Sequence, residues 1–160
     1  MKTLVVIRHA ESDRSNPTLL DCVRPLSRKG KQEAQSIAQR LRSNSLMPSE
    51  ILSSTAIRAL ETARLILEQL NLPITALTAC EEIYGHGPQG LIVATKKLKP
   101  ETKIACLVGH NPDVTDFAGM LTGIPINDMP TSGILAVEFD LLHWPKSMEA
   151  TGRPIHFSGP

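Results

Sequence analysis

The stretch Thr3-Leu4-Val5-Val6-Ile7-Arg8-His9 decides the fold class expected for this chain of 160 residues. Its first five residues form a continuous run rich in β-branched side chains, which is typical of a strand buried on both faces. Residues 104–108 repeat the pattern, and Gly109 and His110 follow them. Strands that are buried on both faces occur in parallel sheets covered by helices. The sequence therefore predicts an α/β fold.

The rest of the chain alternates between helical and strand-like patterns. Ser27 suits the N-cap of a helix that runs to about residue 42, because apolar residues recur there at helical spacing. Further helices are expected near residues 55–70, 89–98 and 112–121, and further strands near 50–53, 74–77 and 134–139. This alternation predicts one three-layer domain over residues 1–160, with a mostly parallel central sheet and helices on both faces. Residues 145–160 are rich in Pro, Gly and Ser, so we expect them to be irregular.

The composition excludes several classes of protein. Hydrophobic residues make up 41% and charged residues 21%, as in a soluble globular protein, and a net charge of +1 gives no general reason to bind nucleic acid or an anionic membrane. The apolar run at the N-terminus is too short for an export signal or a membrane span. Cys22, Cys80 and Cys106 are odd in number and form no Cys-x-x-Cys pair, so we expect free thiols and a cytoplasmic location.

Arginine and histidine side chains follow the exits of three expected strands. Arg8 and His9 follow the first strand, Arg58 comes one turn after the second, and His110 follows the strand over 104–108. Because ligands of such folds bind beyond the carboxyl ends of the strands, all four should converge on one crevice. None of these motifs supplies a compensating carboxylate, so the group favours an anion, and arginine donors match the oxygens of a phosphoryl group.

Arg58 strengthens this interpretation. It would lie in the first turn of its helix, where the positive end of the dipole disfavours a cation by about 0.3–1 kcal/mol. A bound anion would reverse that sign and would also use the free N–H groups of the helix. Each of the four residues also has an ordinary structural explanation, such as an exposed arginine that reaches solvent. Their recurrence at equivalent positions favours a common site.

Four segments resemble, in order, the motifs of the histidine phosphatase superfamily. They are LVVIRHAES over residues 4–12, with Ala10 where glycine is usual; RPLSRKGKQEA over 24–34; SSTAIRALETA over 53–63; and VGHNP over 108–112. Only 28 positions separate Glu82 from His110. Phosphoglycerate mutases of the superfamily carry a long insertion in this interval, so the chain is most similar to the short SixA-type phosphohistidine phosphatases.

The resemblance implies a metal-independent phosphatase that needs no cofactor. His9, as neutral imidazole, would attack phosphorus and form a phosphohistidine intermediate that water then hydrolyses. Arg8, Arg58 and His110 would bind the phosphoryl oxygens and stabilise their charge. Arg24 would line the site or its mouth as a further substrate-binding residue.

The sequence allows more than one proton donor and more than one class of substrate. The resemblance to mutase-like members favours Glu82 as the acid, with Glu81 as the alternative, and either one could instead be a solvated surface carboxylate. SixA-type members lack a clear acid here, and protonated imidazole leaves more easily than an alcohol does. The expected partner is therefore a protein that carries phosphohistidine, such as a histidine phosphotransfer domain. Small phosphate esters or phosphosugars are the alternative.

Two other classes of function would use some of these residues. A metal hydrolase could use His9, His86, His110 and Glu82, yet the sequence has no His-Glu-x-x-His or comparable pair of ligands, and nearby arginines oppose a dication. A non-catalytic phosphoprotein-binding module would keep the arginines but would not need His9. Neither class explains all the motifs together.

Overall fold

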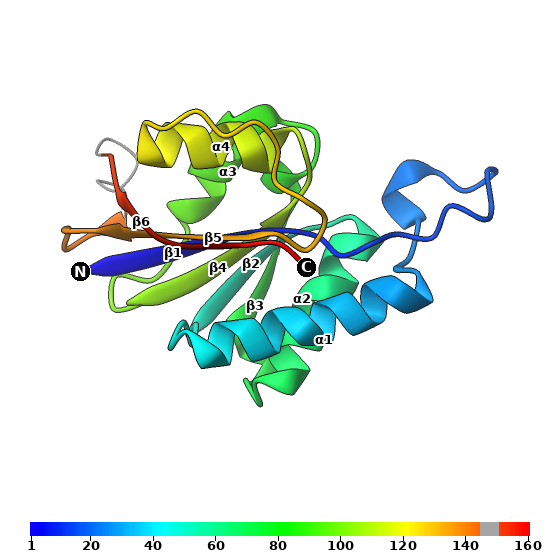
Figure 1. Ribbon diagram of the computed structural model, residues 1–160, viewed down its shortest axis with the longest axis horizontal. Coiled ribbons are helices and arrows are strands. Elements are labelled where there is room, and N and C mark those ends of the chain that lie inside the picture. Colours follow the sequence, from blue (N-terminus) through cyan, green and yellow to red (C-terminus); the bar gives the residue numbers. More distant parts are fainter. Residues whose placement is uncertain (145–150) are drawn as a thin grey trace.

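The computed structural model describes residues 1–144 and 151–160, which contain six strands and four α-helices (Figure 1). The strands are β1 (Lys2–Arg8), β2 (Glu50–Ser54), β3 (Leu77–Cys80), β4 (Ile104–Gly109), β5 (Ile134–Phe139) and β6 (Arg153–Ser158). The helices are α1 (Arg28–Ser43), α2 (Ile57–Gln69), α3 (Gly87–Thr95) and α4 (Asp113–Thr122). Three short 3₁₀ turns lie at Asp21–Val23, Ile74–Ala76 and Glu81–Ile83.

All six strands form one sheet in the order β3-β2-β4-β1-β5-β6. The neighbours from β3 to β1 are parallel, whereas β5 is antiparallel to β1 and β6 is antiparallel to β5. Helices α1 and α2 cover one face of the sheet, and α3 and α4 cover the other (Figure 1). The expected α/β class, with a mostly parallel sheet between two helical layers, is confirmed.

The two faces of β1 explain why its sequence is continuously apolar. Leu4 and Val6 pack in one core with Phe117 of α4, while Val5 and Ile7 pack in the other core with residues of α1 and α2. All four strand side chains are completely buried. Burying each such side chain contributes roughly 1.5–3 kcal/mol. A charge at any of these positions would therefore disrupt one of the two cores.

The C-terminal segment corrects the expectation of an irregular stretch over 145–160. Residues 153–158 form β6, which pairs with β5 at the edge of the sheet, while residues 145–150 lie outside the described part of the chain. Pro154 had argued against a strand because proline cannot donate to a ladder. An edge strand tolerates proline, and the register here shifts between Ala136 and Val137, where Pro154 pairs.

Two smaller differences concern element boundaries. Residues 74–76 form a 3₁₀ turn, and the strand begins only at Leu77, where pairing with Ile51 starts. Helix α4 begins at Asp113, one residue later than expected, and Pro112 is its N-cap residue. The side-chain nitrogen of Asn111, which precedes this proline, donates to the Met129 carbonyl, 2.9 Å away.

The chain between β1 and α1 projects beyond the carboxyl end of the sheet (Figure 1). Ser27 caps α1 as expected, because its Oγ accepts a hydrogen bond from the Gly30 N–H at 3.0 Å. A Cβ at position 30 would lie 1.9 Å from the carbonyl oxygen of Glu11, so only glycine allows this close approach. The first turn of α1 therefore packs directly on the segment that follows His9.

Cys22, Cys80 and Cys106 are free thiols, as expected. None of the described helices is both long and apolar enough to cross a membrane. The cytoplasmic location stays a prediction.

Candidate active site

The expected arginine and histidine residues meet in one cleft at the carboxyl ends of the parallel strands. The cleft has a volume of about 330 Å³. Its lining includes Arg8, His9, Arg24, Arg58 and His110, together with Glu11, Ser12, Arg14, Asp21, Asn111 and Thr131. The structure thus brings together every residue predicted to bind a phosphoryl group.

His9 has one ring nitrogen that carries a lone pair. Its Nδ1 lies 2.7 Å from the Ala10 carbonyl oxygen, which can only accept, so Nδ1 carries the proton and Nε2 has the lone pair. Arg58 Nε donates to that Nε2 at 3.2 Å. Burial is the main cause that lowers the pKa of His9 to about 4, and Arg58 and Arg8 lower it further. His9 is therefore a neutral imidazole near pH 7.

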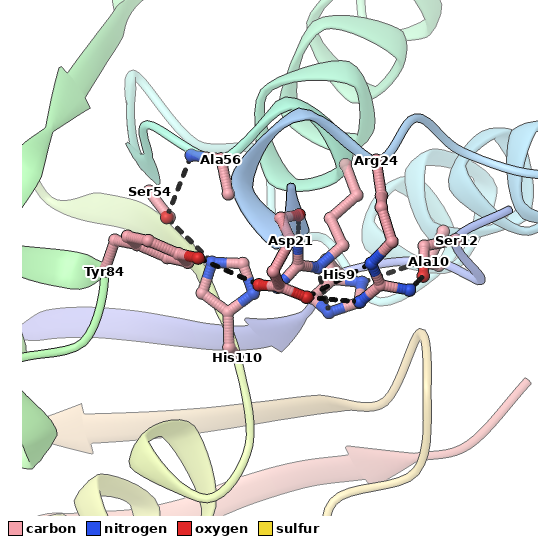
Figure 2. Close-up of polar contacts among 10 residues, drawn as sticks. His9, Ala10, Ser12, Asp21, Arg24, Ser54, Ala56, Tyr84 and His110 are labelled. Atoms are coloured by element: carbon pink, nitrogen blue, oxygen red, sulfur yellow. Dashed lines mark hydrogen bonds and ion pairs between the residues drawn. The ribbon is translucent and has the colours of Figure 1, made fainter. Parts of the chain in front are cut away.

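Ser54 at the end of β2 orients the second histidine (Figure 2). Its Oγ lies 2.7 Å from His110 Nε2 and also accepts a hydrogen bond from the Ala56 N–H at 3.3 Å. The hydroxyl proton is then free to be donated to Nε2, which leaves the proton of the neutral ring on Nδ1. Burial lowers the pKa of His110 to about 3, so the neutral form prevails. His110 Nδ1 is buried without a hydrogen-bond partner among the described residues, as a donor reserved for a ligand would be.

Arg58 is the second residue of α2 and is buried, with 5% of its surface exposed. Besides its bond to His9, its Nη1 donates to the Asp21 carbonyl at 2.7 Å and its Nη2 to Asp21 Oδ2 at 2.9 Å. A guanidinium that is desolvated at the positive end of a helix dipole needs anionic partners. Arg58 is therefore not the exposed arginine of the alternative explanation.

Arg8 also lines the cleft and is anchored to the loop before β5. Its Nη1 donates to the Met129 carbonyl at 2.8 Å and lies 3.7 Å from Asp128 Oδ2. Its Nε is buried without a hydrogen-bond partner within the described chain. Like His110 Nδ1, this unsatisfied donor favours an anionic ligand.

Asp21 is the site residue that the sequence reasoning missed. Its Oδ1 accepts bonds from Arg24 Nε at 3.1 Å and Nη2 at 2.7 Å, and its Oδ2 accepts from Arg58 and from the Tyr84 hydroxyl at 2.9 Å (Figure 2). Partial burial raises the pKa of Asp21, but the hydrogen bonds from Arg24, Tyr84 and Arg58 outweigh it and hold the pKa far below its usual range. The motifs had implied a cleft without a carboxylate, but Asp21 supplies one. The one local signal was the spacing of three residues between Asp21 and Arg24.

Glu82 is not brought into the cleft. Its Oε1 pairs with Lys97 Nζ at 2.7 Å, and the hydrogen bond from Lys97 lowers the pKa of the carboxyl group. The cleft lining includes neither Glu82 nor Glu81, and His86 is exposed on the turn before α3. An ionised carboxylate that is held by a lysine outside the cleft has neither the proton nor the position that a general acid needs.

The described residues, 1–144 and 151–160, contain no group of three His, Cys, Asp or Glu side chains that could hold a metal ion. His9 and His110 are paired with each other at a ring-centroid distance of 4.9 Å, and both are surrounded by arginines. The local charge suits an anion.

Residues 4–112 match the family described as the histidine phosphatase superfamily (branch 1). The chain belongs to this superfamily. It is also 30% identical, over 135 residues and 78% of its length, to an uncharacterised chloroplastic protein of Arabidopsis thaliana, and it spans 61% of that relative. The matched segment begins in β1 and ends just after His110, so it contains all five predicted phosphoryl-binding positions.

Solved structures share the fold over nearly the whole chain. A protein of Agrobacterium tumefaciens, provisionally assigned as the phosphohistidine phosphatase SixA, superposes with a TM-score of 0.82 at 24% identity, covering 99% of this chain and 98% of its own. The protein histidine phosphatase SixA in complex with tungstate gives 0.75 at 22% identity, with coverages of 97% and 95%. A mycobacterial glucosyl-3-phosphoglycerate phosphatase with VO₃ gives 0.70 at 16% identity, with coverages of 96% and 97%.

Proposed function

We propose that this protein is a metal-independent phosphatase in which His9 Nε2 accepts the phosphoryl group. The observation that carries the proposal is the state of His9: its Nδ1 proton is committed to the Ala10 carbonyl, so Nε2 has the lone pair, and His9 lines one cleft with Arg8, Arg58 and His110. The lone pair accepts a hydrogen bond from Arg58 Nε, which the attack on phosphorus would replace. A nucleophile of this kind needs a low pKa and positive charge around the phosphoryl oxygens. The site supplies both.

The reaction would proceed in two displacements at phosphorus. In the first, the bond from phosphorus to the leaving group breaks as a bond to His9 Nε2 forms, and the electron pair departs with the leaving group. In the second, water attacks phosphorus, the bond to Nε2 breaks, and inorganic phosphate is released. Arg8, Arg58 and the Nδ1–H of His110 would stabilise the charge on the three equatorial oxygens in both steps.

Phosphohistidine on a protein is the proposed substrate. The cleft offers no protonated carboxyl group near pH 7, because hydrogen bonds hold the pKa values of Asp21 and Glu11 below their usual range, and Glu82 is paired with Lys97 outside it. An alcohol leaving group needs a proton donor, whereas a protonated imidazole leaves without one. The fold shared with the tungstate-bound SixA structure also supports this choice.

Small phosphate esters are the second candidate. A phosphatase of glucosyl-3-phosphoglycerate has the same fold, so the architecture is compatible with that class of substrate. The open cleft, lined by eleven residues and joined to a second hollow, would admit either a side chain on a protein or a small molecule.

Hydrolysis of para-nitrophenyl phosphate by the wild type and two histidine variants tests the proposed chemistry. We expect activity that a chelator does not reduce and that His9→Ala abolishes, while His86→Ala, which removes an exposed histidine outside the cleft, keeps it. Loss of activity with a chelator would favour a metal hydrolase. Tight binding of phosphohistidine without any turnover would favour a binding module.

A further inference from the structure

A second hollow adjoins the phosphoryl cleft, and Asp21 stands between the two. The second hollow has a volume of about 390 Å³ and is lined by Arg14, Asn16, Pro17, Leu19, Asp21 and Arg24. Of these residues, Arg14, Asp21 and Arg24 also line the cleft that contains His9 and His110. A phosphoryl group in the cleft would therefore have this hollow beside it, where the rest of a substrate could lie.

Asp21 is the one carboxylate that lines the second hollow. Arg24 is neutralised by its ion pair with Asp21, and Pro17 and Leu19 give the hollow an apolar wall. A planar ring that carries an N–H group fits these surroundings, because its faces can contact the apolar wall while its N–H meets the carboxylate. Arg14 is the second arginine of this lining, so the hollow holds two guanidinium groups and one carboxylate.

We propose that the second hollow is the leaving-group subsite, that it takes the ring of an N-phosphorylated imidazole, and that Asp21 accepts the N–H of the ring nitrogen that does not carry phosphorus. The inference rests on the proposed function, whose substrate class it narrows. When that far nitrogen is protonated, the P–N bond breaks with its electron pair remaining on the ring, the P–Nε2 bond forms at His9, and neutral imidazole leaves. A carboxylate that accepts a hydrogen bond from this N–H stabilises the protonated ring, which is the form that leaves.

The contacts of Asp21 indicate how a ligand would gain access to it. A carboxylate has about four acceptor positions, and in this structure Arg24 fills two, Arg58 one and Tyr84 one. The Tyr84 hydroxyl is the neutral donor of the four, but Tyr84 lines neither hollow and donates to Oδ2 (Figure 2). Arg24 lines the second hollow and donates only to Oδ1, so a ring N–H that enters from this hollow would share Oδ1 with Arg24.

The test compares two substrates in the same variants. We expect Asp21→Asn to lower the ratio of kcat/KM for N-phosphohistidine to kcat/KM for para-nitrophenyl phosphate by about tenfold or more, since a charge-assisted hydrogen bond is lost only for the imidazole. Asp13 also lies between β1 and α1 but lines neither hollow, so Asp13→Asn should leave the ratio unchanged. If Asp21 only positioned Arg58 and Arg24, both substrates would suffer equally and the ratio would stay constant, which would overturn the subsite.

A second variant avoids any effect on the arginines. Leu19 is 38% exposed and lines only the second hollow, so Leu19→Lys should place a cation beside the leaving ring and lower the same ratio, whereas Leu19→Gln should not. An unchanged ratio in Leu19→Lys would count against the subsite. Wild-type protein that hydrolyses only the ester would overturn the subsite alone, and wild-type protein that hydrolyses neither compound would overturn the proposed function itself.

Discussion

The ring of His9 lies 4.9 Å from the ring of His110, centroid to centroid, although the two residues are far apart in the sequence. The parallel register of β1 and β4 explains this contact, because Arg8 pairs with Gly109 and each histidine is the next residue along its strand. The His9 N–H also donates to the Gly109 carbonyl at 3.0 Å, which continues the ladder by one bond. The sheet thus brings the two imidazoles together without help from a loop.

Replacing Arg58 should remove most of the activity. Arg58→Ala should lower kcat for para-nitrophenyl phosphate by about 10²–10³-fold, by analogy with the loss of one oxyanion donor. Arg64→Ala is the matched control, because Arg64 lies on the same helix but is exposed and outside the cleft. Equal activities of the two variants would contradict the role of Arg58.

Ser54 should act through the tautomer of His110. In Ser54→Ala the hydrogen bond to Nε2 is lost, and the loss of one bond of roughly 0.5–1.5 kcal/mol predicts that kcat falls about two- to tenfold. Nitrogen chemical shifts of His110 should report protonated Nδ1 in the wild type and a mixture of tautomers in the variant. A His110 ring protonated at Nε2 in the wild type would refute this assignment.

The sequence predicted which arginines and histidines meet in the cleft because each one follows a strand whose apolar run is easy to recognise. Arg8, His9 and His110 occupy strand exits, and Arg58 follows β2 in the first turn of its helix. Asp21 does not follow a strand exit, so this pattern could not identify it. It lies in a 3₁₀ turn of the long segment between β1 and α1, whose path depends on tertiary contacts. The bond that defines its role joins it to Arg58, 37 residues away.

For Glu82 and β6, the local sequence suggested an environment that the structure does not have. Glu82 follows a strand exit as Arg8 and His110 do, but Lys97, two residues after the end of α3, pairs with it outside the cleft. For β6, the proline and glycine content suggested a surface segment, although the edge of a sheet accepts such residues. In both cases, a partner distant in sequence determines the outcome.

Glu82→Gln should therefore have little effect on catalysis. We expect kcat for para-nitrophenyl phosphate to change by less than about twofold and the free energy of unfolding to change little, because an ion pair that solvent screens contributes little. Lys97→Gln, which removes the other partner of the pair, should behave in the same way. A large loss of kcat in Glu82→Gln alone would restore Glu82 as the proton donor.

The low pKa values of the two histidines predict the acid side of the activity profile. His9 must be neutral to attack, and its pKa of about 4 keeps it neutral down to that pH. The kcat/KM for para-nitrophenyl phosphate should thus stay nearly constant between pH 6.5 and pH 5. An acid limb centred near pH 6.5 would show that His9 titrates like an exposed histidine.

The same shifts predict how stability changes with pH. Between pH 6.5 and about 4 the unfolded chain binds protons at His9 and His110 that the folded protein does not, so the free energy of unfolding should rise with pH through this window and fall as the solution is acidified. Urea unfolding at a series of pH values measures this slope. His9→Ala should reduce the slope, and an unchanged slope would contradict the burial of a neutral His9.

Trapping the phosphorylated protein tests the central claim most directly. Wild-type protein mixed rapidly with radiolabelled phosphoramidate and denatured in base should carry label that is stable to base, is released by acid, and maps to the peptide containing His9. His9→Ala should carry none, whereas His86→Ala should be labelled like the wild type. Turnover without any label on His9, or label on another residue, would contradict the account.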